Sequence, residues 1–440
     1  MAELRVWMNG EEVASWQETT QGSRLTYLPS WLASPGARPL SLSLPLLPSG
    51  EDHRGHVVSD YFDNLLPDNA EIRNRIRDRF RLRSADTFEL LREIGRDCVG
   101  AVQLLPNGRT PDDVHAIRSS PLSEAQVAGV LRRVTVRPMP GQPAVDYDEF
   151  RISIAGAQEK TGLLRHEGQW CVPIGSTPST HIFKLPLGLV GNMRADMGRS
   201  VENEWLCMQL LAAFGIPVAN TAMETFEEQR VLVVERFDRR LSRDGAWWVR
   251  LPQEDMCQVF GLPPSRKYES DGGPGIVQIM NVLRQSLEPQ DRATFFKTQL
   301  LFWMLAATDG HAKNFSVHIE PGGRFRMTPI YDVLSVYPIL GRGPGQLDPR
   351  NAALAMSVSG KNRHRHLTGI RRRHWNATAR ACGIAEGAEP WIAELLDRME
   401  PAIAQVQARL PAAYPDEVAR PIFEGLRQAA NRLAAMKPEA

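Results

Sequence analysis

The sequence lacks an excess of charge of either sign, because its 440 residues include 52 lysines and arginines and 51 aspartates and glutamates. A chain so balanced is neither a highly basic nucleic-acid coat nor an acidic solvating tail, although a local patch can still bind an anion. Hydrophobic residues make up 42% of the chain and charged residues 23%, as in ordinary globular proteins. Disorder as the dominant state is excluded, and the length predicts two or three domains or one large two-lobed body.

Cysteine pairs with metal-binding or redox spacing are also missing. The five cysteines are scattered and form no C-x-x-C motif, which excludes a zinc ribbon and a thioredoxin-type site. We expect them to be small buried hydrophobic residues in a reducing compartment. The N-terminus has no long apolar run of a signal peptide, and the most apolar run, LLFWMLAA at 300–307, is too short to span a bilayer. The sequence therefore predicts a soluble cytoplasmic protein without a membrane contact.

Residue patterns predict a strand-rich first part and a mostly helical second part. Asn9-Gly10 between alternating apolar residues predicts a hairpin, and Leu40, Leu42 and Leu44 alternating with serines predict a half-buried strand. Further strands are expected around 150–165, 181–186 and 230–237, and helices at 69–81, 87–94 and 201–214. From about 255 onward helices are expected to dominate, interrupted by one hairpin at 314–332. The Pro- and Gly-rich stretch 138–143 is the best linker candidate.

The segment ATDGHAKNFSVHIEPGGRFRMTPIYD, residues 307–332, carries the strongest chemical signal. An apolar helix stops before Asp309, Asn314 follows five positions later, and a hairpin returns the chain to Asp332. Kinase-type phosphoryl transfer needs a carboxylate that accepts the substrate hydroxyl's proton, then an amide on magnesium, then a second carboxylate that holds the metal on the phosphates. The D-x-x-x-x-N spacing alone also occurs in turns. The hypothesis of a kinase-type site therefore depends on the buried helix before Asp309 and on the hairpin that returns Asp332. Two features depart from the protein-kinase pattern: Thr308 replaces the usual arginine, and no Phe-Gly follows Asp332.

Two more segments are candidates for the nucleotide site. Lys184 in the strand HIFKLP either contacts the phosphates and pairs with Glu202 or Glu204 of the next helix, or reaches past the strand edge to water. In SIAGAQEKTGLL, residues 153–164, Gly156 lies between alanines, which lets backbone amides approach phosphates closely. The segment is neither a Walker A loop nor the glycine-rich loop of protein kinases, so on its own a small-residue turn is the simpler interpretation.

A set of longer motifs closely resembles the HipA family, the serine/threonine-kinase toxins of HipBA toxin–antitoxin modules. These motifs are SIAGAQEKT, HIFKLP, VVERFDRR, LPQEDMCQVFGLP, KYESDGGPG, ATDGHAKNFSV and PIYDVLS, preceded by ARPLSLSLPL, YFDNLLPDN and EIGRDCVGAV. The resemblance covers most of the chain and implies an α+β, two-lobed protein-kinase-like fold with a strand-rich N-terminal part and a mostly helical C-terminal lobe. It implies an N-terminal subdomain at 1–140, a kinase-like N-lobe at 141–250 and a helical C-lobe at 251–440.

The same resemblance implies roles for individual residues. Asp309 would be the catalytic base, Asn314 and Asp332 would hold Mg²⁺, and Ser153 would be the autophosphorylated serine. ATP would be bound by Ala155, Gly156, Ala157, Gln158, Glu159, Lys160, Lys184, Glu235, Arg236, Phe237, His311, Ala312, Lys313, Asn314, Tyr331 and Asp332. A phosphate on Ser153 adds about −1.5 to −2 charges next to the ATP loop. We therefore expect the phosphorylated form to stop binding ATP and to be inactive.

A local basic patch is present in this otherwise balanced chain. From Pro349 to Ala385 there is no acidic residue, whereas eight lysine and arginine residues occur. Such a segment suits a phosphate backbone or is simply a solvated helix face. The resemblance implies that the chain binds operator DNA together with a HipB-type helix-turn-helix antitoxin and co-represses its own operon, with Arg380 at a DNA-contacting position. It also implies phosphorylation of glutamyl-tRNA synthetase, which halts translation and leads to growth arrest and persistence.

Other functions fit parts of the pattern. A HipA-like kinase that acts on a different aminoacyl-tRNA synthetase, or a small-molecule kinase, would share the Asp…Asn…Asp order. A catalytically dead module that only co-represses is disfavoured because Lys184, Asp309, Asn314 and Asp332 are all present. Toxicity that a neighbouring helix-turn-helix gene relieves would separate a toxin from a small-molecule kinase.

Overall fold

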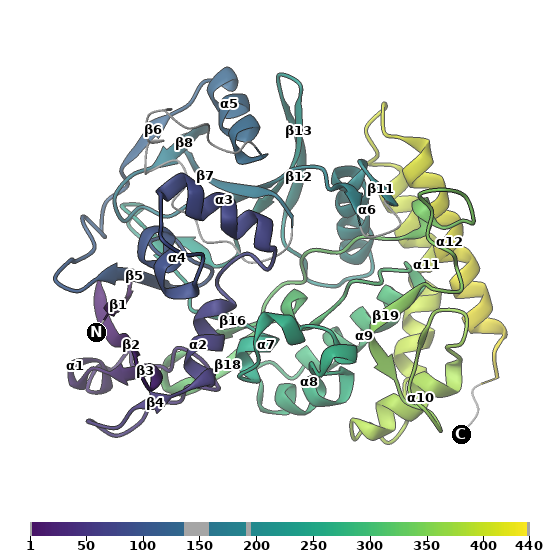
Figure 1. Ribbon diagram of the computed structural model, residues 1–440. Coiled ribbons are helices and arrows are strands. Elements are labelled where there is room, and N and C mark those ends of the chain that lie inside the picture. The colour runs from purple at the N-terminus through teal and green to yellow at the C-terminus, as the bar shows by residue number, and fades with distance from the viewer. Residues whose placement is uncertain (1, 136–157, 191–194, 438–440) are drawn as a thin grey trace. The chain divides into compact units, whose positions relative to one another are not determined.

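The computed structural model describes residues 2–135, 158–190 and 195–437, and the chain in it divides into two compact units. Unit 1 comprises Met1–Leu185, Glu224–Arg266 and Ser316–Phe325, and unit 2 comprises Pro186–Met223, Lys267–Phe315 and Arg326–Ala440. Each unit is therefore assembled from segments that are far apart in the sequence, as the colours of Figure 1 show. The linker candidate 138–143 lies outside the described residues.

The N-terminal part of unit 1 is an antiparallel sheet with short helices packed on it. Its strand order is β4-β3-β2-β1-β5. Asn9 and Gly10 have φ angles of 49° and 88°, so both adopt the left-handed conformation of a tight hairpin turn, which confirms the predicted hairpin. The Trp16 ring is fully buried and stacks on Phe62 with 3.9 Å between ring centroids. The elements are β1 (Ala2–Met8), β2 (Glu11–Thr19), β3 (Gly22–Tyr27), α1 (Pro29–Leu32), β4 (His53–Arg54), α2 (His56–Asp63), α3 (Ala70–Phe80), α4 (Thr87–Ile94) and β5 (Val102–Pro106).

The half-buried strand expected around Leu40 to Leu44 is wrong. Only one isolated bridge, between Ser41 and Leu44, forms there, and the chain turns back on itself. Leu40 and Leu44 are buried as the alternation suggested, but the polar groups between them bond to a carboxylate and a carbonyl oxygen instead of a neighbouring strand. The Leu42 amide and the Ser41 hydroxyl donate to Glu254, and the Ser43 hydroxyl donates to the Gln258 carbonyl oxygen. A carboxylate 212 residues away has thus replaced the sheet partner.

The buried Glu254 side chain makes the stability of this region sensitive to pH. Its burial, which outweighs the hydrogen bonds from Ser41 and Leu42, raises the pKa of Glu254 to about 8. The folded chain therefore holds a proton that the unfolded chain has lost, and stability falls as the pH rises from about 4.5 towards about 8. We expect Glu254→Gln, which mimics the protonated acid, to lose this dependence in melting temperatures recorded between pH 5 and pH 9. Identical pH profiles for the variant and the wild type would contradict this expectation.

The second sheet of unit 1 carries the candidate phosphate-binding residues. Its strand order is β12-β13-β9-β7-β8-β6, and α5 packs on β7 and β13 over a core that includes Phe183 and Val231. The expected strands at 181–186 and 230–237 are confirmed, and the part of 150–165 that the structure describes contains β7. The elements are β6 (Ser119–Pro121), α5 (Glu124–Thr135), β7 (Lys160–His166), β8 (Gln169–Pro173), β9 (His181–Lys184), β12 (Thr221–Phe226) and β13 (Gln229–Glu235).

Short strands and turns complete unit 1. β14 pairs with β15 in a hairpin, and a three-stranded sheet has the order β16-β17-β18, so the hairpin expected within 314–332 is confirmed. The elements are β14 (Arg239–Leu241), β15 (Trp248–Arg250), β16 (Gln253–Asp255), α7 (Met256–Val259), η1 (Pro264–Arg266), β17 (Ser316–Ile319), η5 (Pro321–Gly323) and β18 (Phe325–Met327), whose last two residues belong to unit 2.

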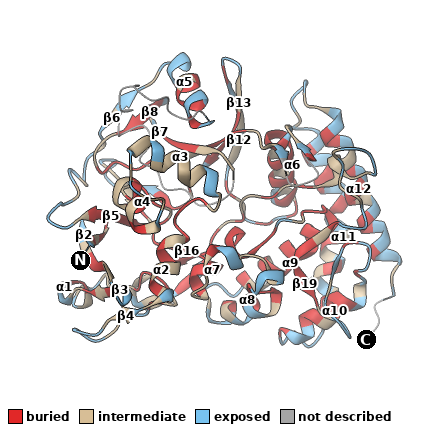
Figure 2. Cartoon of the chain, in the orientation of Figure 1, coloured by how far each residue is buried: buried red, intermediate tan, exposed pale blue. Residues whose placement is uncertain are grey.

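Unit 2 is mostly helical, and its long helices α6, α9, α11 and α12 pack on one another (Figure 1). Figure 2 shows α9 as largely buried, which agrees with its apolar sequence. A second hairpin, β19–β20, was not expected in this part of the chain. The elements are β10 (Gly188–Val190), β11 (Ala195–Met197), α6 (Ser200–Ala213), η2 (Glu269–Asp271), α8 (Ile276–Val282), η3 (Leu283–Gln285), α9 (Asp291–Met304), η4 (Ala312–Asn314), η6 (Tyr337–Ile339), β19 (Ala353–Val358), β20 (His364–His366), α10 (Arg372–Ala381), α11 (Glu389–Gln407) and α12 (Asp416–Ala435).

The expectation that the cysteines are buried is confirmed. All five cysteines are buried and unbridged. Among the described residues, no helix is both long enough and apolar enough to cross a membrane.

Candidate active site

The chain leaves the buried helix α9 through a tight turn that exposes Asp309. After Met304, Ala306 adopts a left-handed φ of 49°, and the Ala307 amide donates to the Phe302 carbonyl oxygen at 2.7 Å. Gly310 is buried, and a Cβ atom there would lie 2.2 Å from the Phe302 ring, so only glycine fits. Asp309 is consequently presented at the surface, directly before buried residues of the loop.

Asn314 braces the loop that begins at Asp309. Its Oδ1 accepts a hydrogen bond from the His311 amide at 3.1 Å, and its Nδ2 donates to the Asp332 carbonyl oxygen at 3.4 Å. The Tyr331 hydroxyl donates to the Lys313 carbonyl oxygen at 2.7 Å. Two segments 18 residues apart are thus tied together at Asn314 and Asp332, as the Asp…Asn…Asp order predicted.

Other segments of unit 2 hold the chain in place on both sides of Asp332. Before it, Ile330 exchanges backbone hydrogen bonds with the 217–219 segment at 2.9 Å. After it, the Ser335 hydroxyl donates to the Leu305 carbonyl oxygen at 2.6 Å, and the Asn203 side chain bonds both backbone groups of Ser335. Asp332 itself has a φ of 63°, which is strained for an aspartate. Such strain persists only where the surroundings impose it, and it concentrates at functional sites.

The donor set of Asn314 and Asp332 suits a magnesium ion. Mg²⁺ prefers oxygen ligands and is usually held by one or two carboxylates together with substrate phosphates. The Asp332 carboxylate and the Asn314 amide oxygen are ligands of that kind, and an amide oxygen that accepts one hydrogen bond keeps a second lone pair. Within the described residues no group of three or more His, Cys, Asp or Glu side chains could hold a metal alone.

Two lysines lie opposite each other where β7 begins in unit 1. Lys184 on β9 lies directly opposite Lys160 on β7 in the antiparallel register, so their side chains point to the same face. Lys184 is only 6% exposed. This register fits phosphate binding at the C-terminal end of the predicted ATP loop.

The remaining residues of the predicted ATP loop are only partly described. Gln158 and Glu159 precede β7, and the Leu185 amide donates to the Glu159 carbonyl oxygen at 3.1 Å. The Glu159 side chain forms an ion pair with Arg75 of α3. Ser153, Ala155, Gly156 and Ala157 lie outside the described residues.

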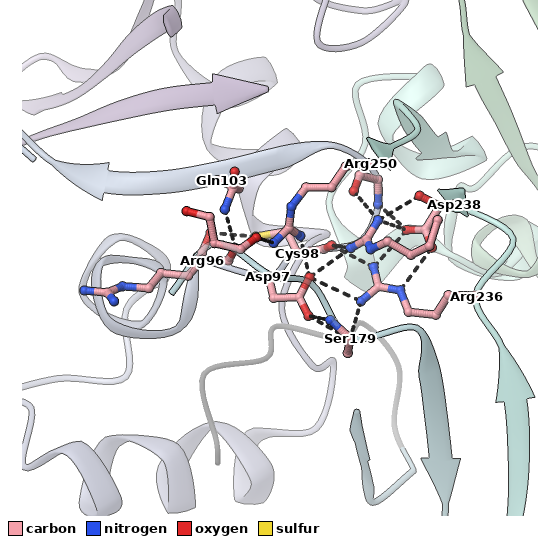
Figure 3. A network of polar contacts seen from close by, with 12 residues as sticks. Arg96, Asp97, Cys98, Gln103, Ser179, Arg236, Asp238 and Arg250 are labelled. Carbon is pink, nitrogen blue, oxygen red and sulfur yellow. Dashed lines mark hydrogen bonds and ion pairs between the residues drawn. The ribbon is translucent and has the colours of Figure 1, made fainter. Parts of the chain in front are cut away.

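Arg236, one of the three expected hinge residues, is anchored in a buried charge network that sequence reasoning missed (Figure 3). Glu235 is exposed at the end of β13, and Phe237 packs edge-on against His318. The Arg236 side chain, by contrast, is buried and donates to Asp238, Ser179 and the Cys98 carbonyl oxygen. The Arg236 backbone is engaged as well, because its amide donates to the Thr180 carbonyl oxygen and its carbonyl oxygen accepts from the Arg239 amide, so a contact of Arg236 with ATP stays a prediction.

The same network links segments of unit 1 that are far apart in the sequence. Asp97, between α4 and β5, accepts from Arg239 and Arg250 and from both the amide and the hydroxyl of Ser179. Asp238 accepts from the Gly100 amide at 2.7 Å. Two carboxylates thus face three guanidinium groups, and each of these five side chains is at most 6% exposed. The N-terminal part of the chain is joined through it to the segment that follows β13.

Sequence reasoning also missed a neighbour of Asp309. The Tyr268 hydroxyl donates to Asp309 Oδ1 at 2.6 Å. The only signal in the sequence was the segment KYESDGGPG, which has no spacing relation to Asp309. Helix α6 buries both Glu202 and Glu204, and the contact of either with Lys184 stays a prediction because Lys184 belongs to the other unit.

The basic segment is less positive in the structure than in the sequence. Acidic residues from outside the segment pair with three of its eight cations: Arg350 with Asp348, Arg363 with Glu269 and Arg372 with Glu389. Five others are exposed: Lys361, Arg365, Arg371, Arg373 and Arg380. Arg373 and Arg380 lie seven residues apart on α10 and therefore share its exposed face.

Comparison with known proteins places these features in a family. Residues 152–405 match the HipA-like C-terminal domain, and residues 4–105 match the HipA N-terminal domain. The chain is 33% identical to a putative kinase, Y4mE, of Sinorhizobium fredii over 77% of this chain and 78% of that one. It is 29% identical to the serine/threonine-protein kinase toxin HipA of Shewanella oneidensis over 73% of this chain and 72% of that one.

A solved structure extends the likeness to the fold. The HipA chain in the complex of Shewanella oneidensis HipA, HipB and operator DNA superposes with a TM-score of 0.78, covering 98% of both chains at 23% identity. This likeness confirms the predicted α+β, kinase-like fold class. Since the two family domains together match most of the chain, at residues 4–105 and 152–405, the protein belongs to the HipA family.

Proposed function

We propose that this protein is an ATP-dependent serine/threonine protein kinase that acts as a toxin. The observation that carries the proposal is the junction between the Asp309 loop and the Asp332 segment, where Asn314 donates to the Asp332 carbonyl oxygen. The facing lysines Lys160 and Lys184 support the nucleotide part of the proposal. Membership in a family that includes a serine/threonine-kinase toxin supports a serine or threonine hydroxyl as the phosphate acceptor.

The chemistry assigned to each side chain follows from its type and exposure. Bound ATP supplies the γ-phosphoryl group, and Mg²⁺ neutralises charge on the phosphates. Asp309, exposed at the start of its loop, accepts the proton of the attacking serine hydroxyl. Asn314 and Asp332 would hold the metal. Lys184, together with Lys160, would contact the phosphates of ATP. The backbone after β13 would contact its adenine base.

For the acceptor we propose glutamyl-tRNA synthetase, as the family resemblance implies. The experiment that tests this is transfer of labelled phosphate from ATP to that synthetase, in parallel with other aminoacyl-tRNA synthetases as alternative acceptors. Selective labelling of glutamyl-tRNA synthetase supports the proposal. Labelling of another synthetase supports the kinase assignment with that synthetase as the substrate. If no synthetase is labelled, the protein-kinase assignment is contradicted. Autophosphorylation at Ser153, with loss of ATP binding, is part of the same proposal.

The proposed partners are a HipB-type antitoxin and operator DNA, with co-repression of the chain's own operon. The solved complex of a HipA with HipB and operator DNA supports this proposal, as does the exposed face of α10. Residues such as Arg380 would contact phosphates and position the complex, whereas the antitoxin would read the sequence.

Reversing charge on α10 is expected to weaken the operator complex. In Arg373→Glu/Arg380→Glu, operator affinity of the complex with the antitoxin should fall, because two phosphate contacts become repulsive. The slope of log K against log salt should shrink in magnitude by about 0.9 per lost contact. Fluorescence anisotropy at several salt concentrations measures both quantities. Arg409→Glu/Arg420→Glu, an equal charge change at exposed positions, is the control, and equal effects of the two double variants would refute a DNA role for α10.

A further inference from the structure

Tyr268 is built into the neighbourhood of Asp309 by its backbone. The Tyr268 carbonyl oxygen accepts from the Asp271 amide at 3.0 Å and from the Gly273 amide at 2.9 Å. The carbonyl oxygen of the preceding Lys267 accepts from the Ala312 amide of the Asp309 loop at 3.0 Å. Backbone hydrogen bonds therefore connect the short helix η2 and the Asp309 loop into one part of unit 2.

Glu269, the residue after Tyr268, makes further contacts that hold this part of unit 2 in place. The Glu269 carboxylate accepts hydrogen bonds from the amide and the hydroxyl of Ser357 on β19 and from Arg363. Its side chain is only 8% exposed. Tyr268 thus begins a segment that is held by β19 on one side and by the Asp309 loop on the other.

The Tyr268 side chain is directed at Asp309 by packing as well as by its hydroxyl group. Its ring meets the His311 ring edge-on, with 5.1 Å between centroids and an interplanar angle of 81°. The hydroxyl donates to Asp309 Oδ1 at 2.6 Å, the distance of a hydrogen bond to a charged acceptor. Among the residues that the structure describes, Asp309 Oδ2 has no hydrogen-bond partner.

We infer that Tyr268 is a positioning residue for Asp309. Its hydroxyl holds one carboxylate oxygen, which fixes the orientation of the carboxylate and leaves Oδ2 to accept the proton of the acceptor hydroxyl. A carboxylate on an exposed loop otherwise rotates among several orientations, and only some of them suit proton transfer. The inference rests on the proposed kinase function, because it gives Asp309 the role of the base.

Tyr268→Phe removes the hydroxyl and keeps the ring that packs on His311. We expect kcat for phosphotransfer to fall at least about tenfold, as for loss of one hydrogen bond to a charged group. The KM for ATP and the melting temperature should stay at the wild-type values. Adding Tyr268→Phe to Asp309→Asn should lower the rate no further, because the hydroxyl acts through the carboxylate. Tyr337→Phe is the matched control, since its hydroxyl donates to the Met304 and Gly425 carbonyl oxygens instead.

A crystal structure of the Tyr268→Phe variant gives a result that does not depend on activity. We expect the Asp309 carboxylate to occupy more than one orientation there, against one in the wild type. A single unchanged orientation, an unchanged kcat, or a rise in KM for ATP alone would each overturn the inference. If the wild type transfers no phosphate while the variant's carboxylate is reoriented, the kinase proposal fails and the positioning contact stands.

Discussion

Replacing Asp309 by asparagine is expected to reduce kcat for phosphotransfer by about 10² to 10⁴, the range that general bases contribute. Asparagine has nearly the same size and still accepts the Tyr268 hydrogen bond, but its amide cannot take the proton of the acceptor hydroxyl. The KM for ATP should change little, because Asp309 contacts the acceptor rather than the nucleotide in the proposed arrangement. Initial rates of labelled phosphate transfer measure the effect.

The control for Asp309→Asn is Asp271→Asn. Asp271 is an exposed carboxylate at the end of η2, in the same part of unit 2, and it has no role in the proposed chemistry. It should keep wild-type rates, and both variants should keep the wild-type melting temperature because both side chains are exposed. Wild-type activity of Asp309→Asn would remove Asp309 from the role of base and with it the proposed mechanism.

Local patterns predicted those parts of the fold that local interactions decide. The helix expected at 69–81 is α3, Ala70–Phe80, and the Asn69 side chain caps it by accepting from the Glu71 amide. The helix expected at 87–94 is α4, Thr87–Ile94, which Gly95 ends. In both cases the capping residues adjoin the helix in the sequence, so no distant contact was needed to find its ends.

Patterns failed where a distant residue decides the local structure. The serines between Leu40 and Leu44 looked like the outer face of a strand, but their hydroxyl groups bond to Glu254 and Gln258. Nothing in the spacing of residues 40–44 reveals a carboxylate more than 200 residues away. The charge of the basic segment was overestimated for the same reason, since Glu269 and Glu389 lie outside it.

The residues of the candidate site also divide into those that local sequence patterns predicted and those that they did not. The order Asp309, Asn314, Asp332 was visible because a loop and a hairpin bring these residues together within a short stretch of sequence. Tyr268 was not visible, because it reaches Asp309 from 41 residues away through a segment without a known spacing rule. The meeting of Lys184 with Asp309 and Asp332 joins two units and stays a prediction of the family resemblance.

The second large effect is expected in the buried network of Figure 3, where Asp97→Asn should lower the free energy of unfolding by about 3–5 kcal/mol. Asp97 is 2% exposed and is the carboxylate that Arg239 and Arg250 both contact, together with both polar groups of Ser179. Without its charge, Asp238 is the remaining carboxylate of the network for three buried guanidinium groups. An unbalanced buried charge is unfavourable because the chain cannot solvate it as water does.

The pKa of Asp97 supports the same expectation. Burial alone would raise the pKa of Asp97, but the charges of Arg250, Arg236 and Arg239 outweigh burial and hold the pKa well below its usual range. The carboxylate therefore contributes stability above about pH 4, and this contribution is lost as the pH falls below that value, because the unfolded chain takes up a proton that the folded chain does not. Asp97→Asn should lack this acid-dependent part of the unfolding curve.

Guanidinium unfolding followed by tryptophan fluorescence measures the loss at neutral pH and again near pH 3, where the unfolded chain has taken up the proton. Asp113→Asn is the control, because Asp113 pairs with Arg118 at the surface, where the two side chains are 57% and 56% exposed. A pair so exposed contributes at most about 1 kcal/mol. If Asp97→Asn destabilises the protein no more than Asp113→Asn does, the contacts of Asp97 contribute little to the stability of unit 1. In that case the expected hinge is positioned by the sheet and by the contacts of Arg236 with Asp238, Ser179 and Cys98 rather than by Asp97.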